Sequence, residues 1–336
     1  MDVQTLGITV LWTFLYGYLI VASIDFGAGF YAFYSKYTKR DHLTNRLILR
    51  YLSPVWEVTN VFFVGLVGFF PDSAYYFGTA LLVPASIVLV LIAIRGSFYA
   101  FANYGSNDSM FYTFLYGATG LLIPAAMSTT LTISQGGFIR KTNDTVEFLG
   151  TKLFSNFYSW TVVALAIVSV LYISAMFLLF YADKAKDEGA TPLIRKWALF
   201  WSGPTILVCA LVFFGLKNQA AWHYENILNG NWWWFAASFL FFLIAVTLVY
   251  MKKNYGIAFV AVMLQYAVAW FGYGYTHLPY ILYPYIDINK AVVNETMASA
   301  LVVVFIFGLL LLIPALYLIL RLFLFDNDYV RGKSSK

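Results

Sequence analysis

The stretch YLSPVWEVTN, residues 51–60, runs directly into the apolar stretch VFFVGLVGFF, residues 61–70. Together they predict a membrane-spanning helix that carries a carboxylate, Glu57, well inside it. A charged side chain at that depth costs about 3 kcal/mol or more unless a partner offsets it. The stretch therefore predicts both a membrane protein and a buried polar site around Glu57.

The composition supports a protein whose solvent is the bilayer. Of the 336 residues, 61% are hydrophobic and 11% charged, and the mean hydropathy is +0.74. A soluble domain carries about 25% charged residues, so this chain cannot cover a surface that faces water. We expect an all-α integral membrane protein that contacts lipid and binds no nucleic acid. The single cysteine, Cys209, excludes an internal disulfide and a cysteine metal cluster.

Apolar stretches of about 20 residues, the length that a helix needs to cross a bilayer, occur nine times. They are residues 6–34, 47–70, 75–104, 111–133, 158–181, 197–216, 233–250, 255–275 and 297–325. The longest outer connection, residues 134–157, separates four spans from five. Short loops within each group predict two four-helix bundles, residues 1–136 and 137–286, followed by a peripheral ninth helix and tail at residues 287–336.

The basic residues orient these spans. Fifteen of the 21 Lys and Arg residues fall on one side, five on the other, and Arg95 lies within the third span. Because cytoplasmic loops carry the excess of Lys and Arg, the N-terminus is predicted outside and the C-terminus in the cytoplasm.

Three ionisable residues lie clearly inside apolar spans: Asp25, Glu57 and Arg95. At 1.5 Å of rise per residue, they lie about 16, 10 and 13 Å along their helices from Lys36, Arg50 and the end of the third span. Three consecutive helices thus place charges at similar depths, in the inner half of the membrane. We expect the three side chains to meet.

The neighbouring residues favour such a meeting. Gly27, Ala28 and Gly29 follow Asp25, and small residues let another helix come close. On the second span Ser53, Glu57 and Asn60 follow at i, i+4 and i+7, which predicts one polar stripe facing the protein interior.

Two carboxylates and one guanidinium leave a surplus negative charge in a poorly solvated place. Such a group is suited to bind and release a proton near neutral pH. Two alternatives stay open: a structural ion network that fixes helix register, and a coupling-ion or substrate site of a secondary transporter. Against the transporter, all three charges lie in the first half of the chain.

The sequence predicts no haem ligand within a span. His42 falls in an inner loop, and His223 and His277 lie near the outer ends of spans, where we expect interfacial polar anchors. Nucleotide-binding and metalloprotease motifs are absent from the sequence. On its own the chain is not expected to carry redox chemistry.

Three motifs resemble a known family. IDFGAGFY at residues 24–31, LSPVWEVTNVFF at residues 52–63 and LIAIRGSFYAF at residues 91–101 are similar to signatures of subunit II of the cytochrome bd-type quinol oxidases. The resemblance implies a complex in a bacterial or archaeal cytoplasmic membrane that couples quinol oxidation to reduction of dioxygen to water. It implies a homologous, larger subunit I that carries two haems b, one haem d and the quinol site. It also implies a small single-helix accessory subunit.

In such a complex this chain would bind no cofactor, stabilise the haem-bearing subunit and line a proton path from the cytoplasm. Asp25 and the pair Trp56–Glu57 match family positions, as does Arg95, which implies proton transfer by the acids, a charge partner in Arg95 and interface packing by Trp56. The chain departs from the family at Glu57, where aspartate is more frequent. It also departs where Asn60 and Ala100 replace acids, and this shorter acidic set leaves the details of the path open. The remaining alternative shares the fold and makes the subunit a purely structural assembly partner.

Overall fold

The computed structural model describes residues 3–40, 74–104, 110–142, 145–291 and 295–323. Within these residues seven helices are long and apolar enough to cross a membrane. They are α1 (Val3–Tyr37), α4 (Ala74–Tyr104), α5 (Met110–Ser134), α7 (Phe157–Ala185), α8 (Ala190–Gln219), α10 (Trp233–Tyr250) and α11 (Tyr255–His277).

These seven helices coincide with seven of the predicted spans. An eighth helix, α13 (Glu295–Phe323), matches the predicted last span as far as residue 323, where the described residues end, and it contains a shorter apolar stretch, Val302–Ala315. The predicted second span, residues 47–70, lies outside the described residues. The structure therefore describes an all-α membrane protein, and the count of nine stays a prediction.

The two ends of α7 and the start of α8 show how the sequence sets the helix ends. The Asn156 side chain accepts a hydrogen bond from the backbone N–H of Tyr158 at 2.8 Å and caps the start of α7. Lys186 ends α7 in a left-handed conformation. The Asp187 carboxylate then accepts from the backbone N–H of Ala190 at 2.9 Å, which starts α8. A turn this short makes α7 and α8 antiparallel neighbours.

One predicted boundary was wrong by seven residues, since α8 begins at Ala190 and not at residue 197. The additional turns carry Arg195, whose side chain donates to the carbonyl oxygens of Val249 at 2.8 Å and Tyr250 at 2.7 Å. These carbonyls end α10, where a helix leaves acceptors unpaired. Arg195 therefore has a structural role in the turns of α8 that precede its apolar stretch, because it binds the end of α10.

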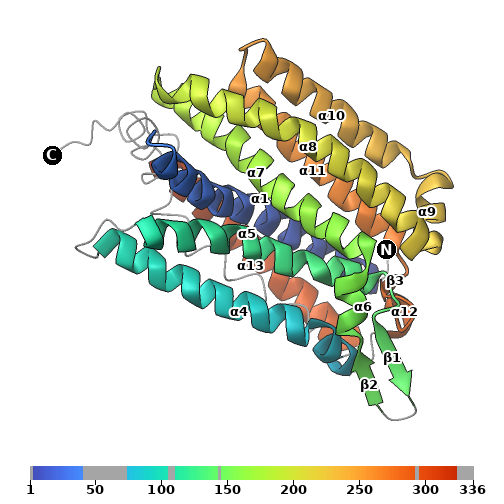
Figure 1. The fold of residues 1–336 in the computed structure, drawn as a ribbon. Helices are drawn as coiled ribbons and strands as arrows, with labels where there is room; N and C mark the ends of the chain where they lie inside the picture. Colours follow the sequence, from blue (N-terminus) through green and yellow to red (C-terminus); the bar gives the residue numbers. More distant parts are fainter. Residues whose placement is uncertain (1–2, 41–73, 105–109, 143–144, 292–294, 324–336) are drawn as a thin grey trace.

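Helix α7 lies at the centre of the packing. It contacts α1, α5, α8 and α11, and its residues from Val170 to Leu179 are all buried. Along the chain, α4 packs on α5, α7 on α8 and α10 on α11, while α1 also contacts α5 and α13. Figure 1 shows these helices side by side, with the short elements gathered at the end where the N-terminus lies.

We call this the hairpin end, because two small antiparallel sheets lie there. They pair β1 (Ile139–Thr142) with β2 (Thr145–Phe148), and β3 (Tyr280–Leu282) with β4 (Ile286–Asp287). The short helices α6 (Gly150–Ser155), α9 (Ala221–Leu228) and α12 (Ile288–Ala291) accompany them (Figure 1). Connections between spans fold here into compact structure and not into open loops.

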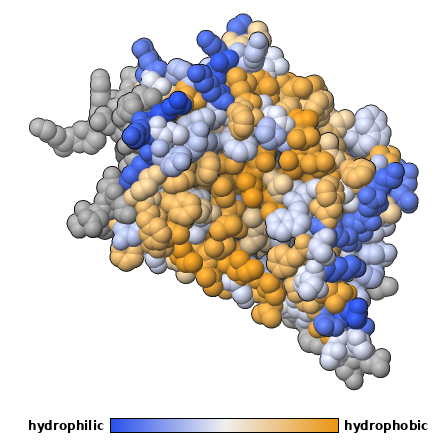
Figure 2. Space-filling view, in the orientation of Figure 1, coloured by the Kyte–Doolittle hydropathy of each residue, from blue (hydrophilic) through white to orange (hydrophobic). Residues whose placement is uncertain are grey.

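The outer surface is apolar across the middle of the molecule. Figure 2 shows hydrophobic residues in this region and hydrophilic residues toward both ends of the helices. Large apolar side chains such as Leu89 on α4, Phe200 on α8 and Leu240 on α10 are exposed. Exposed side chains of this kind suit contact with lipid and not with water.

The small residues after Asp25 allow the close helix contacts that the sequence predicted. A Cβ added at Gly27 would overlap Ser174 of α7, and one at Gly29 would lie 2.7 Å from the ring of Tyr116 on α5. Ala28, between them, is fully buried. Helix α1 therefore approaches α5 and α7 at a distance that larger side chains would prevent.

Replacing Gly27 with Ala should destabilise the protein by about 1–3 kcal/mol, because the added methyl group forces α1 away from α7. The measurement is the midpoint of thermal unfolding of the purified complex in mild detergent. Gly17→Ala, on the same helix, is the matched control, since nothing lies within 4 Å of its added Cβ. Equal midpoints for the two variants would contradict the tight contact.

Candidate functional site

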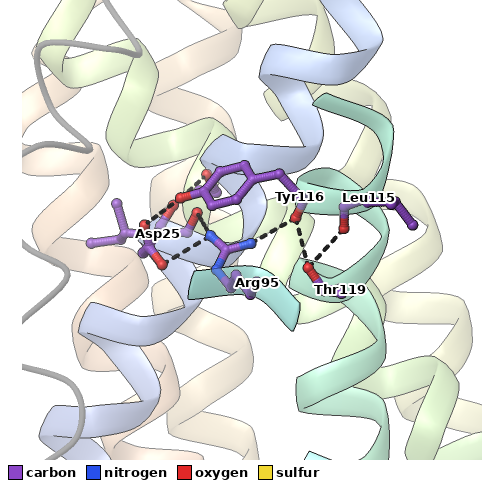
Figure 3. A network of polar contacts seen from close by, with 7 residues as sticks. Asp25, Arg95, Leu115, Tyr116 and Thr119 are labelled. Atoms are coloured by element: carbon purple, nitrogen blue, oxygen red, sulfur yellow. Dashed lines mark hydrogen bonds and ion pairs between the residues drawn. The ribbon is translucent and has the colours of Figure 1, made fainter. Parts of the chain in front are cut away.

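An ion pair between Asp25 of α1 and Arg95 of α4 forms the candidate site. The Arg95 Nη2 atom lies 2.9 Å from Asp25 Oδ2, and each side chain is 2% exposed. Figure 3 shows the two side chains meeting beside α5, which contributes Tyr116 and Thr119. Both charges are withdrawn from lipid, as the sequence analysis predicted for these two residues.

The Arg95 guanidinium has further partners that hold it in place. Its Nη1 donates to the Tyr116 carbonyl oxygen at 2.7 Å, and its Nη2 donates to the backbone carbonyl of Asp25 at 3.2 Å. The guanidinium carbon lies 3.9 Å from the centre of the Tyr116 ring and 5.1 Å from that of Phe26. Desolvated contacts of this kind add about 2 kcal/mol each. Gly120 leaves room for the group, since an added Cβ would lie 2.9 Å from Nη1.

The two oxygens of Asp25 have different partners. Oδ2 pairs with Arg95, whereas Oδ1 lies 3.4 Å from the Tyr116 hydroxyl. The Thr119 hydroxyl, one turn along α5, donates to the carbonyls of Leu115 at 2.8 Å and Tyr116 at 3.1 Å. Arginine thus occupies one side of the carboxylate, and a neutral hydroxyl faces the other.

The other predicted members of the site belong to the segment between α1 and α4. Glu57, Ser53, Asn60 and Trp56 all lie in residues 41–73, outside the described part of the chain. In the described part the charges of Asp25 and Arg95 balance, so a surplus negative charge here depends on Glu57. Sequence reasoning missed Tyr116, because one tyrosine among 26 carries no distinguishing signal.

A second buried polar cluster lies at the hairpin end. His223 Nδ1 lies 2.9 Å from the Gln135 side-chain nitrogen, and His223 Nε2 lies 2.9 Å from the Thr276 hydroxyl. Gln135 also donates to the Tyr273 hydroxyl at 2.6 Å. His277 contacts the Ser134 hydroxyl at 3.3 Å and the backbone carbonyl of Tyr280 at 2.6 Å. The cluster joins the end of α5 to α9 and α11.

The prediction of interfacial anchors was wrong for both histidines, since His223 is 0% and His277 6% exposed. Trp222 stacks on the His223 ring at 5.2 Å between ring centres, and the short helix α9 brings both residues to the cluster. Burial, together with the nearby His277, lowers the pKa of His223 to about 3. Both ring nitrogens of each histidine contact protein atoms, so neither side chain fits the role of an axial haem ligand.

In the described part of the chain, the fold and the buried Asp25–Arg95 pair define a multi-pass membrane protein with an ion pair inside its apolar helices. The family model of cytochrome bd terminal oxidase subunit II matches residues 3–323. The chain belongs to this family, and its homologues are subunits of an oxidoreductase complex, the bd-type quinol oxidase.

Two relatives agree with this assignment. The chain is 32% identical to the "Putative cytochrome bd menaquinol oxidase subunit II" of Bacillus subtilis (strain 168), over 98% of this chain and 99% of the relative. It also matches a chain from "The structure of bd oxidase from Geobacillus thermodenitrificans" with 54% identity and a TM-score of 0.83. That match covers 97% of this chain and 100% of the other. Haem in the complex and a quinol substrate follow from the family.

The ion pair predicts a mutant cycle. Arg95→Met leaves the Asp25 charge buried without its partner and should cost about 3–5 kcal/mol, whereas Asp25→Leu combined with Arg95→Met should recover most of that loss. The readouts are the thermal unfolding midpoint and the yield of intact complex. A double variant whose loss equals the sum of the losses of Arg95→Met and of Asp25→Leu alone would show that the pair is not coupled.

The hairpin-end cluster predicts a pH effect on stability. The pKa of His223 is about 3 in the folded protein against 6.5 for the free side chain, so the unfolded state binds more protons between these values. Stability should therefore fall as the pH is lowered below 6.5, by about 2 kcal/mol at pH 5. Thermal unfolding of the wild-type complex and of His223→Gln at pH 7 and pH 5 measures this. The variant should lose less stability than the wild type, and equal losses would exclude His223 as the cause.

Proposed function

We propose that this chain is the haem-free subunit of a bd-type oxidase that couples quinol oxidation to reduction of dioxygen to water. In this role it stabilises a larger, haem-bearing subunit I and contributes a proton path from the cytoplasm through Asp25 and Glu57. The observation that carries the proposal is the Asp25–Arg95 pair, buried between α1, α4 and α5. The name of the Bacillus subtilis relative favours menaquinol as the quinol.

The positions of the flanking helices support a second membrane span at residues 47–70. At the end of α1, Tyr34 contacts Trp197 near the start of α8, far from the hairpin end. Helix α4 begins at the hairpin end, where Tyr76 stacks on Tyr285 at 5.5 Å and α4 contacts β2. The chain between α1 and α4 thus has to return from one end of the molecule to the other. One crossing by residues 47–70 achieves this and completes nine helices.

The same crossing would bring Glu57 toward Asp25. Glu57 follows Arg50 by seven residues, about 10 Å of helix, which places it in the same half of the membrane as Asp25. Ser53 and Asn60 would then extend the polar stripe, and Trp56 would pack near the interface with subunit I. A carboxylate added beside a balanced ion pair gives a site with room for one proton.

Architecture and orientation follow the same proposal. Residues 1–136 and 137–286 form two four-helix bundles, with residues 287–336 as the peripheral ninth helix and cytoplasmic tail. Contacts of α7 with α8, α10 with α11 and α11 with α7 support the second bundle. The hairpin end faces outward with the N-terminus, because Lys36, Lys184 and Arg195 lie toward the opposite end.

The cofactors would lie in the partner. Two haems b, one haem d and the quinol site belong to subunit I, and a small single-helix subunit joins the complex in the bacterial or archaeal cytoplasmic membrane. The engaged ring nitrogens of His223 and His277 support this division. The comparisons give no support to the transporter alternative.

Asp25→Asn and Glu57→Gln should each lower quinol-dependent oxygen consumption at least tenfold in an intact, haem-loaded complex, because neither amide can accept and release the proton. Oxygen consumption and proton uptake by the purified complex provide the measurement. Glu147→Gln is the control, since this acid is exposed on β2 at the hairpin end. Normal turnover in both test variants would leave the ion pair a purely structural role.

A further inference from the structure

Tyr116 contacts both members of the ion pair, through three different groups. Its backbone carbonyl accepts from Arg95 at 2.7 Å, and its ring lies 3.9 Å from the guanidinium carbon. Its hydroxyl lies 3.4 Å from Asp25 Oδ1. Figure 3 shows the tyrosine ring lying across the pair, with the hydroxyl toward Asp25 and the carbonyl toward Arg95. The position of Tyr116 therefore determines how the Asp25 carboxylate and the Arg95 guanidinium meet.

This arrangement makes the two oxygens of Asp25 chemically unequal. A proton on Oδ2 would compete with and weaken the hydrogen bond from Arg95 Nη2, whereas a proton on Oδ1 would leave that bond in place. The hydroxyl opposite Oδ1 is both a donor and an acceptor. It can donate to the carboxylate and, after rotation about its C–O bond, accept from the carboxylic acid. Tyr116 is therefore suited to accompany Asp25 through both protonation states.

The surroundings hold Tyr116 in this position. The ring packs against Gly29 of α1, where an added Cβ would lie 2.7 Å away, and the residue is 6% exposed. Its carbonyl accepts from Thr119 at 3.1 Å in addition to Arg95. Gly29 and Thr119 thus hold the tyrosine from two sides, in addition to its contacts with Arg95.

The described groups that bear on the charge of Asp25 come from the helices packed around α1. Helix α4 contributes the guanidinium and α5 the tyrosine, while α7 presents the neutral Ser174, which donates to the Ile24 carbonyl at 3.1 Å. Helix α1 itself adds Tyr18, which precedes Asp25 by about two helical turns. The charges of both Asp25 and Arg95 act on this tyrosine. On α11, His277 lies at the hairpin end, and on α13 the Tyr317 side chain is 58% exposed.

We propose that Tyr116 is a positioning residue for proton transfer at Asp25. Its ring and carbonyl fix Arg95 on Oδ2, so that Oδ1 is the oxygen that takes up and releases the proton, opposite the Tyr116 hydroxyl. In this exchange an O–H bond forms from a lone pair of Oδ1 when a proton arrives along the proposed path from the cytoplasm, the bond breaks when that proton passes on, and nothing is oxidised or reduced. The proposal rests on the proposed role of Asp25 in proton transfer.

The test compares Tyr116→Phe, which keeps the ring and the carbonyl, with Tyr116→Leu, which also removes the ring. Tyr112→Phe, one turn away on α5, is the matched control, because this ring packs among Phe98, Phe101 and Phe111. Each intact complex is assayed for quinol-dependent oxygen consumption across pH. Each is also titrated while the infrared C=O stretching band of protonated carboxyl groups is recorded.

Loss of the hydroxyl removes a bond that favours the charged carboxylate, and charge-assisted bonds are the stronger ones. Tyr116→Phe should therefore move the pH–activity profile, and with it the carboxyl band, to higher pH. Tyr116→Leu should in addition lower turnover several-fold, since Arg95 loses the ring beneath it. Tyr112→Phe should match the wild type.

Asp25→Asn separates the two proposals. If it abolishes the carboxyl band and turnover while Tyr116→Phe behaves like the wild type in both readouts, the role of Tyr116 is overturned and the proton role of Asp25 stands. If Asp25→Asn leaves both unchanged, the proposed proton role of Asp25 itself fails. Should the Tyr116 variants not assemble, wild-type complex containing isotope-labelled tyrosine gives the same decision. A tyrosine C–O band must then change during the titration and lose that change in Asp25→Asn, and a band that stays constant contradicts the proposal.

Discussion

The pairing of Arg95 with Asp25 is the interaction on which the described architecture depends. In a hydrocarbon environment an unpaired guanidinium or carboxylate costs several kcal/mol, so the two charges force their helices together. Helix α4 illustrates the point, because little of its apolar span is buried inside the protein. Helix α4 packs along α5, and Arg95 adds polar bonds to Asp25 of α1 and to the carbonyl of Tyr116 on α5. One long side chain thus joins three helices.

Close packing supplies what the ion pair does not. Lipid tails are as apolar as leucine, so helices in a membrane associate through shape and small residues more than through a hydrophobic driving force. Gly27 and Gly29 bring α1 against α7 and α5, and Gly120 admits the backbone of α1 and the guanidinium together. The ion pair and the glycines depend on each other, since the charges meet only where the helix backbones come this close.

The hairpin end solves the problem of buried polar groups in a different way. There Gln135, His223 and Thr276 satisfy one another as neutral groups, and burial keeps the pKa of His223 low enough for the ring to stay uncharged. A neutral, fully bonded cluster ties α5 to α9 and α11 without any charge to compensate. The ion pair, in contrast, keeps two charges in the interior, and their desolvation costs free energy. A functional role of the pair is a reason for the protein to retain that cost.

The sequence by itself determined the class, the family and most of the spans, because apolar runs of 20 residues and charges within them have few explanations in a soluble protein. It also indicated that Asp25 and Arg95 would meet, since a buried charge needs a partner and few candidates were available. Tyr116 and the burial of His223 and His277 were decided only by the tertiary structure. In a chain that is 20% aromatic, one tyrosine carries no local signal, and a histidine near a helix end becomes buried only when a distant helix folds over it. Local sequence patterns therefore indicate which polar side chains must be kept away from lipid, whereas long-range packing determines which residues each of these side chains contacts.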